Sequence, residues 1–152
     1  MTTFVDGAAT FAPVTAPLRD WLREAMAAHV GTDTNGTPQV YAGGFPAAVD
    51  LTDGPAVALY TAGGLDGGTA LDRPFARFSV VATSAEAAEA CAYTLRSVLD
   101  HARGAALGPA ADPSEVRLAG ADTAAPLWAP DPDDNSPRFV VTTTLTVQAV
   151  GV

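Results

Sequence analysis

In the last long segment of the chain, mostly apolar positions alternate with mostly polar ones. This alternation limits the kind of sheet that the protein can form. Residues 138–149 read RFVVTTTLTVQA. One face would carry Phe139, Val141, Thr143, Leu145, Val147 and Ala149, and the other Arg138, Val140, Thr142, Thr144, Thr146 and Gln148. This period of two, mostly apolar on one face and polar on the other, predicts a strand in a sheet that is packed on one side and solvated on the other.

Two earlier segments read as further strands. Residues 55–61 (PAVALYT) are followed, after the glycine-rich stretch 62–74, by FARFSVVAT at 75–83. The second segment alternates, with Ala76, Phe78, Val80 and Ala82 on one face and Phe75, Arg77, Ser79 and Val81 on the other. We expect a hairpin whose tip, residues 62–74, is unusually long, and loops of that length are usually functional or mobile.

Two helices are expected. In residues 17–30 apolar side chains recur at helical spacing after Pro17, which suits a first helical turn, and Gly31 is placed to end the helix. In residues 83–103, Thr83 and Glu86 have the spacing of a capping box. Ala88, Cys91, Leu95, Val98 and Ala102 form the apolar face of this second helix, with Gly104 as its stop.

The order of these elements predicts the fold class. Helix, strands, helix and strands follow one another, with a short strand near residue 40 and another at 114–122. We therefore expect a single α+β domain over residues 17–152, a mainly antiparallel β-sheet with helices packed on one face, preceded by an N-terminal arm at 1–16. A chain of 152 residues can bury a core of this kind unaided, although its large apolar side chains are sparse.

The charge balance excludes some partners. The net charge is −9, and all eight basic residues are arginines. Such a surface repels nucleic-acid phosphates and anionic membranes, so sequence-specific DNA binding is not expected, whereas letting DNA pass is compatible with it. The N-terminal segment lacks the features of a signal peptide, and no segment is long and apolar enough to span a bilayer, so we expect a protein made in the cytoplasm without a membrane partner.

The acidic cluster before the last strand raises the question of a metal site. Asp131, Asp133 and Asp134 carry the oxygen ligands that calcium prefers, but the segment lacks the glycine and the closing glutamate of an EF-hand loop. Asp-Pro and Asn-Ser-Pro are also ordinary turn formers. We expect a turn that leads into the strand and no metal.

No other pattern indicates catalysis or a cofactor. The glycines of GGLDGG are not followed by the Lys-Ser or Lys-Thr of a phosphate loop. Cys91 lies on the apolar helix face without a predicted base, and His29 and His101 sit near helix ends, too few with one cysteine for zinc. We expect no catalytic residue, no cofactor and no enzyme activity.

Two arginines beside strands stand out. Arg77 belongs to the polar face of the middle strand, and Arg138 opens the last one. Each could pair with an aspartate within the domain, stay solvated, or reach a carboxylate of a neighbouring subunit through its planar guanidinium group.

The chain resembles the tail terminator proteins of long-tailed bacteriophages, also called tail-to-head joining or tail completion proteins. The resemblance rests on the early helix after a proline, on RPFARFSVVATSAEAAEACAYTLRSVL, and on LWAPDPDDNSPRFVVTTTLTVQAV. In that family a strand runs into a small-residue helix with a Ser-x-x-Glu-Ala-like segment, matched at residues 83–90. A Pro-Arg-aromatic run opens its last strand, matched at Pro137, Arg138 and Phe139.

The resemblance implies a structural virion protein located at the neck of the tail. Such a subunit forms a homo-oligomeric ring, a hexamer in this family, that caps the tail tube, ends its polymerisation and meets the head-tail connector or stopper protein, while genomic DNA passes through the lumen. Interface candidates on this plan are Gly64, Leu65, Asp66, Asp72, Arg73, Arg77, Asp131, Asp133, Asp134 and Arg138. Alternatives are another neck ring, such as a head-tail stopper or connector completion protein, and a small-ligand-binding domain.

Overall fold

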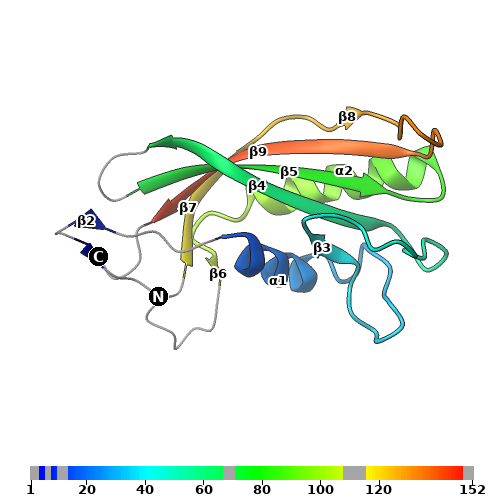
Figure 1. The fold of residues 1–152 in the computed structure, drawn as a ribbon, viewed down its shortest axis with the longest axis horizontal. Helices are drawn as coiled ribbons and strands as arrows, with labels where there is room; N and C mark the ends of the chain where they lie inside the picture. The colour runs from blue at the N-terminus through cyan, green and yellow to red at the C-terminus, as the bar shows by residue number, and fades with distance from the viewer. Residues whose placement is uncertain (1–3, 6–7, 10–13, 67–70, 108–115, 149–152) are drawn as a thin grey trace.

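The computed structural model describes residues 4–5, 8–9, 14–66, 71–107 and 116–148 (Figure 1). Two short strands, β1 and β2, pair with each other near the N-terminus. The remaining elements form a single sheet and two helices. In chain order they are β1 (Phe4–Val5), β2 (Ala8–Ala9), α1 (Thr15–Ala25), β3 (Val40–Ala42), β4 (Ala56–Asp66), β5 (Leu71–Val81), α2 (Ala85–Asp100), β6 (Ala106–Leu107), β7 (Val116–Thr123), β8 (Leu127–Trp128) and β9 (Arg138–Gln148).

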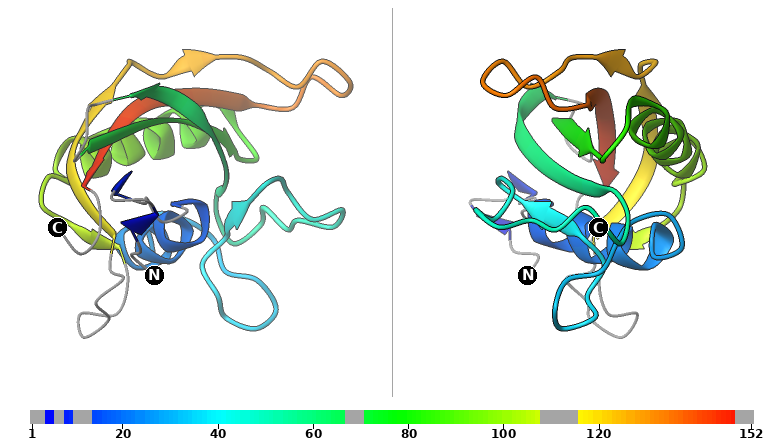
Figure 2. Two further views of the ribbon diagram at one scale, coloured as in Figure 1. Left: turned by 60° about the vertical axis from the view of Figure 1, so that its left-hand side comes forward. Right: turned by 90° about the vertical axis from the view of Figure 1, so that its right-hand side faces the viewer.

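The sheet confirms the predicted α+β class. Its strands lie in the order β3-β4-β5-β9-β7-β6, and β8 pairs with β9 beside β7. Every pair is antiparallel except β3 with β4, which is parallel. The sheet curls strongly, so that it arches over α1 (Figure 2).

The closing strand β9 divides as its alternation predicts. Its residues Phe139, Val141, Thr143, Leu145 and Val147 are buried, while Thr142, Thr144 and Thr146 are partly exposed and Gln148 is exposed. Ala149 lies outside the described residues. Val140 departs from the pattern, since it lies on the second face and is nevertheless buried next to its cross-strand partner Leu127 of β8. The strand is central, with β5 on one side and β7 and β8 on the other.

The prediction of a long hairpin tip at residues 62–74 is wrong. β4 continues to Asp66 and β5 begins at Leu71, so only residues 67–70, which lie outside the described part, connect them. The glycines did not end the strand because cross-strand hydrogen bonds use only the backbone; an irregularity in the pairing between Ala62 and Leu65 accommodates them instead.

The prediction that Thr83 caps the second helix is also wrong. Ser84, not Thr83, is the N-cap of α2: its backbone is extended (φ −134°, ψ 159°) and its hydroxyl accepts a hydrogen bond from the Ala87 N–H at 3.2 Å. Glu86 lies in the first turn, where its charge interacts favourably with the helix dipole. Gly104, with φ +82°, follows the end of the helix in a conformation that favours glycine.

Helix α1 is displaced from its predicted span. It begins at Thr15, with Pro17 still in the first turn, and ends at Ala25, well before Gly31. The hydroxyls of Thr15 and Thr61 are hydrogen-bonded, which ties the start of α1 to β4. Because Thr61 pairs with the buried Ala76, this contact places α1 on the buried face of the sheet.

One core joins both helices to that face. It contains the buried side chains of α1, of α2 and of the inward positions of β4, β5, β7 and β9 in a single cluster, with Leu22, Leu95, Leu59, Phe78 and Val141 among its members. We call this side of the sheet the inner face. The other side, the outer face, carries no helix among the described elements. Ala58, Ser79 and Val140 on it are nevertheless buried, whereas Tyr60 and Phe75 are exposed.

Gly54 is the position at which a small side-chain change should disturb the backbone most. Its φ is +147°, and a Cβ added there would lie 2.8 Å from the backbone nitrogen of Gly31. We expect Gly54→Ala to lower the free energy of unfolding by about 1–3 kcal/mol, measured by urea denaturation. Gly120→Ala is the matched control, because a Cβ added at Gly120 would meet nothing within 4 Å and its φ is ordinary. Equal losses at both glycines would contradict the close approach.

Candidate functional site

The outer face of the sheet carries the side chains that the core does not use. Three cross-strand rows follow from the register, and each crosses β4, β5 and β9. They are Ala58, Ser79 and Val140; Tyr60, Arg77 and Thr142; and Ala62, Phe75 and Thr144. Small residues form the first row and are buried, whereas Tyr60 and Phe75 stand out from the next two with 42% and 40% of their surfaces exposed. Such a mixed aromatic and polar surface is typical of protein contacts.

A stripe of alternating charge and aromatic character runs along β5. Arg73, Phe75 and Arg77 are exposed, whereas the intervening Pro74 and Ala76 are buried. We call these three exposed residues the β5 stripe. The sequence pattern placed Phe75 and Arg77 on one face, as the structure confirms, but it did not single out Phe75 or Tyr60 as site residues. The available signal was an aromatic residue on the polar face of a strand.

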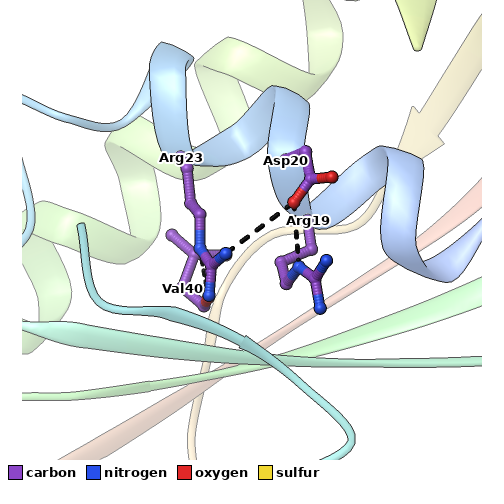
Figure 3. Close-up of polar contacts among 4 residues, drawn as sticks. All are labelled: Arg19, Asp20, Arg23 and Val40. Atoms are coloured by element: carbon purple, nitrogen blue, oxygen red, sulfur yellow. Dashed lines mark hydrogen bonds and ion pairs between the residues drawn. The ribbon is translucent and has the colours of Figure 1, made fainter. Parts of the chain in front are cut away.

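The arginines of α1 are used inside the chain (Figure 3). The Nε of Arg19 donates to Oδ1 of Asp20 at 3.0 Å, and a guanidinium nitrogen of Arg23 lies 3.7 Å from the same oxygen. The Nε of Arg23 also donates to the carbonyl oxygen of Val40, at 3.1 Å. Arg23 thereby links α1 to the edge strand β3, and neither arginine is left to attract a partner strongly.

The other arginines separate into engaged and open groups. Arg96 pairs with Asp100 at 3.9 Å along α2. The Nε of Arg138 donates to the Ala129 carbonyl at 2.8 Å, which holds the loop before β9 against the strand. Arg138 therefore takes the internal role that the sequence left open. In the described part of the chain, Arg73 and Arg77 have no side-chain hydrogen bond or ion pair.

Further exposed apolar side chains lie on β8, which pairs with the start of β9 and not with β5. Leu127 and Trp128 are 65% and 47% exposed. The Trp128 ring packs edge-on against Phe139, with ring centroids 5.2 Å apart, so one side of the indole is anchored to the sheet. Rigid, partly exposed aromatic side chains of this kind lose little conformational entropy when a partner covers them.

The acidic cluster forms the predicted turn. Oδ1 of Asp131 accepts from the Asp133 N–H at 2.8 Å, and Oδ1 of Asp134 accepts from the Ser136 N–H at 2.9 Å. Asn135, at φ +57°, donates its N–H to the Asp131 carbonyl. The hydrogen bonds from Ser136 hold the pKa of Asp134 below its usual range. We call residues 131–134 the acidic turn; the Asp133 carboxylate is exposed there and makes no hydrogen bond within the described part.

Two more aspartates lie at the same end of the sheet, just before β4. The Asp53 carboxylate accepts from the N–H and hydroxyl of Thr32, and that of Asp50 from the N–H and hydroxyl of Thr52. These hydrogen bonds lower the pKa of both carboxyls. Because the start of β4, at Ala56, pairs with Val81 and the latter with the start of β9, this end of the sheet is strongly acidic.

The structure separates the sequence-predicted interface residues into two groups. Asp72, Arg73 and Arg77 lie on β5, whereas the acidic turn and Arg138 lie at the start of β9. Gly64, Leu65 and Asp66 belong to β4 rather than to a loop, and their side chains lie outside the described part. The Asp72 carboxylate accepts from the backbone N–H of Arg73 at 3.0 Å.

Known chemical sites are not indicated by the described residues. Within residues 14–66, 71–107 and 116–148 no three His, Cys, Asp or Glu side chains are arranged to hold a metal ion. Cys91 is buried, and burial raises the pKa of its thiol to about 12. In the described part of the chain, no helix is both long and apolar enough to cross a membrane.

Comparisons with known proteins add no relative. No protein-family model matches this chain, and no curated protein matches it in sequence. Function is therefore inferred from the surfaces described above and from the resemblance in pattern.

Proposed function

We propose that this protein is a structural virion subunit of the tail terminator kind. Copies of the chain form a ring on the completed tail tube of a long-tailed phage, end the polymerisation of the tube and join the tail to the head connector or stopper protein. The protein is not an enzyme in this proposal and takes no cofactor. The ring encloses the path of the genomic DNA without reading its sequence.

The observation that carries the proposal is the outer face of the sheet, on which the described residues place no helix. It presents Tyr60, Phe75, Arg73 and Arg77 to solvent, while both helices lie on the other side. A subunit whose role is to contact other subunits needs such a surface, in which exposed aromatic side chains lie beside arginines that make no ion pair within the described residues. The net charge of −9 further supports a wall past which DNA moves without binding.

The test is the distribution of tail lengths, seen by electron microscopy, in lysates of a phage from which this gene has been removed. We expect overlong or irregular tubes and unattached filled heads, because nothing stops addition of tube subunits. Supplying the gene on a plasmid should restore tails of uniform length.

Two other results would overturn the proposal in different ways. Tails of normal length that fail to join heads would assign the protein to another ring of the neck, such as the head-tail stopper. Complete, infectious particles would remove it from the tail.

A further inference from the structure

The register separates the acidic turn from the β5 stripe of the same chain, because the two lie towards different ends of the sheet. The acidic turn precedes Arg138, which pairs with Val81 at the end of β5. Arg77 lies four residues from Val81, and Arg73 lies eight. At about 3.3 Å per residue, this places the two arginines roughly 13 and 26 Å from that end of the strand.

The acidic turn also points away from the stripe. The loop at residues 129–137, orange in the left view of Figure 2, projects beyond the end of the sheet at which β9 begins. Its shape is fixed by the hydrogen bonds of Asp131 and Asp134 to backbone N–H groups, which leaves the exposed Asp133 carboxylate at its tip without a partner in the described part. The turn is thus a preformed, negatively charged projection.

We propose that the acidic turn of one copy of the chain docks on the β5 stripe of a second copy, with the carboxylate of Asp133 paired to Arg77. This contact rests on the proposed function and deepens it, since it states which surfaces of neighbouring ring subunits meet. Phe75 and the neighbouring Tyr60 supply the apolar part of the contact, and the guanidinium groups on either side of Phe75 supply its polarity.

Charge complementarity favours a second copy as the occupant. The acidic turn carries three aspartates within four residues, so a second copy presents a local cluster of carboxylates to the two arginines of the stripe. Face-to-face pairing of two stripes is disfavoured, because it would place Arg73 and Arg77 of one copy against those of the other. The contact is therefore between two different surfaces.

A contact between different surfaces has a geometric consequence. Each copy still offers a free stripe at one side and a free acidic turn at the other, so addition continues until the rotation between copies closes a ring, or without limit in a filament. This type of growth is what a ring-forming subunit requires.

The test uses two full-length variants and sedimentation velocity over a series of concentrations. Arg77→Glu makes the stripe repel the acidic turn, and Asp133→Arg makes the turn repel the stripe. We expect each variant alone to self-associate at least tenfold more weakly than the wild type. An equimolar mixture should regain association, because the reversed stripe of one variant matches the reversed turn of the other, and the two unaltered surfaces still match.

Matched controls change the same charges elsewhere. Arg103→Glu reverses an exposed arginine after α2, and Glu89→Arg reverses an exposed acid on α2; neither residue belongs to the stripe or the turn. Both should associate like the wild type. Raising the salt concentration should weaken wild-type association, because the ion pairs lie at a partly solvated contact. Circular dichroism checks that every variant is folded.

Several results would overturn the contact. They are a wild type that remains monomeric throughout the series, variants that associate as well as the wild type, and a mixture that does no better than its components. Its failure is distinguishable from that of the proposed function. If Arg77→Glu self-associates like the wild type while the gene deletion gives overlong tails, only this contact is wrong. If mixing the two variants restores association while the gene deletion leaves tails intact, only the tail function is wrong.

Discussion

Phe78→Ala should lower the free energy of unfolding by about 3–5 kcal/mol, measured by urea denaturation monitored by circular dichroism. Phe78 is fully buried at the centre of the inner face, where it lies opposite Leu59 on β4 and Val141 on β9. Truncation to alanine removes its apolar contacts and leaves a cavity that the neighbouring strands cannot close. Since domains are stable by only about 5–15 kcal/mol, the variant would lose a large part of its stability.

The same strand offers the control for this prediction. Phe75→Ala removes an identical side chain from the outer face, where 40% of the residue is exposed, and should cost about 1 kcal/mol or less at protein concentrations low enough to prevent association. If Phe78→Ala is too unstable to study, Phe78→Leu takes its place. Its loss in free energy of unfolding should lie between the losses expected for Phe78→Ala and Phe75→Ala. Equal losses at the two positions would contradict the register, because a slip of one residue exchanges the faces of a strand.

Cys91 should react with a thiol reagent about a thousand times more slowly in the folded protein than in the unfolded protein at pH 8. Burial raises the pKa of its thiol from 9.0 to about 12, and each unit reduces the reactive thiolate about tenfold below pH 9. The measurement is the rate of disulfide exchange with an aromatic disulfide, with and without guanidinium chloride.

The pH dependence of stability has a defined sign at this cysteine. The folded chain favours the protonated thiol, so the contribution of Cys91 to stability is fully present below pH 9. It is lost as the pH rises from 9 towards 12, because the unfolded chain ionises first. A cysteine introduced at the exposed position Glu89, in a Cys91→Ala background, is the positive control and should react rapidly in the folded state. Rapid reaction of Cys91 in the folded wild type would mean that α2 opens readily from the sheet.

Local patterns predicted the faces of the strands and of the second helix correctly. The alternation of β9 and of β5 follows from the backbone geometry of an extended chain, which sends successive side chains to opposite sides whatever the strand pairs with. The apolar face expected for the second helix is buried at Ala88, Cys91 and Leu95, whereas Val98 is partly buried and the buried Ala102 lies past the end of α2. The position of Cys91 in the core could therefore be predicted.

Features that depend on pairing could not be read from the sequence. Glycines at 63 and 64 suggested a loop, yet β4 passes through them because β5 supplies hydrogen-bond partners for the backbone regardless of side chain. The choice of Ser84 over Thr83 as the helix cap is a second case. Both residues have a suitable hydroxyl, and the path of the chain leaving β5 decides which one reaches the free N–H group.

The candidate interaction surface also combines features that local sequence patterns predict with features that only tertiary contacts decide. Local patterns were enough to establish that Arg77 shares a face with Phe75, that residues 131–134 form a turn, and that the chain is acidic. Packing in three dimensions was needed to show that the outer face carries no helix in the described part, that Arg138 is engaged by Ala129, and that the acidic turn and the β5 stripe lie apart. The physical reason is that side-chain direction is set by local backbone geometry, whereas partner, register and distance are set by contacts between segments far apart in the sequence.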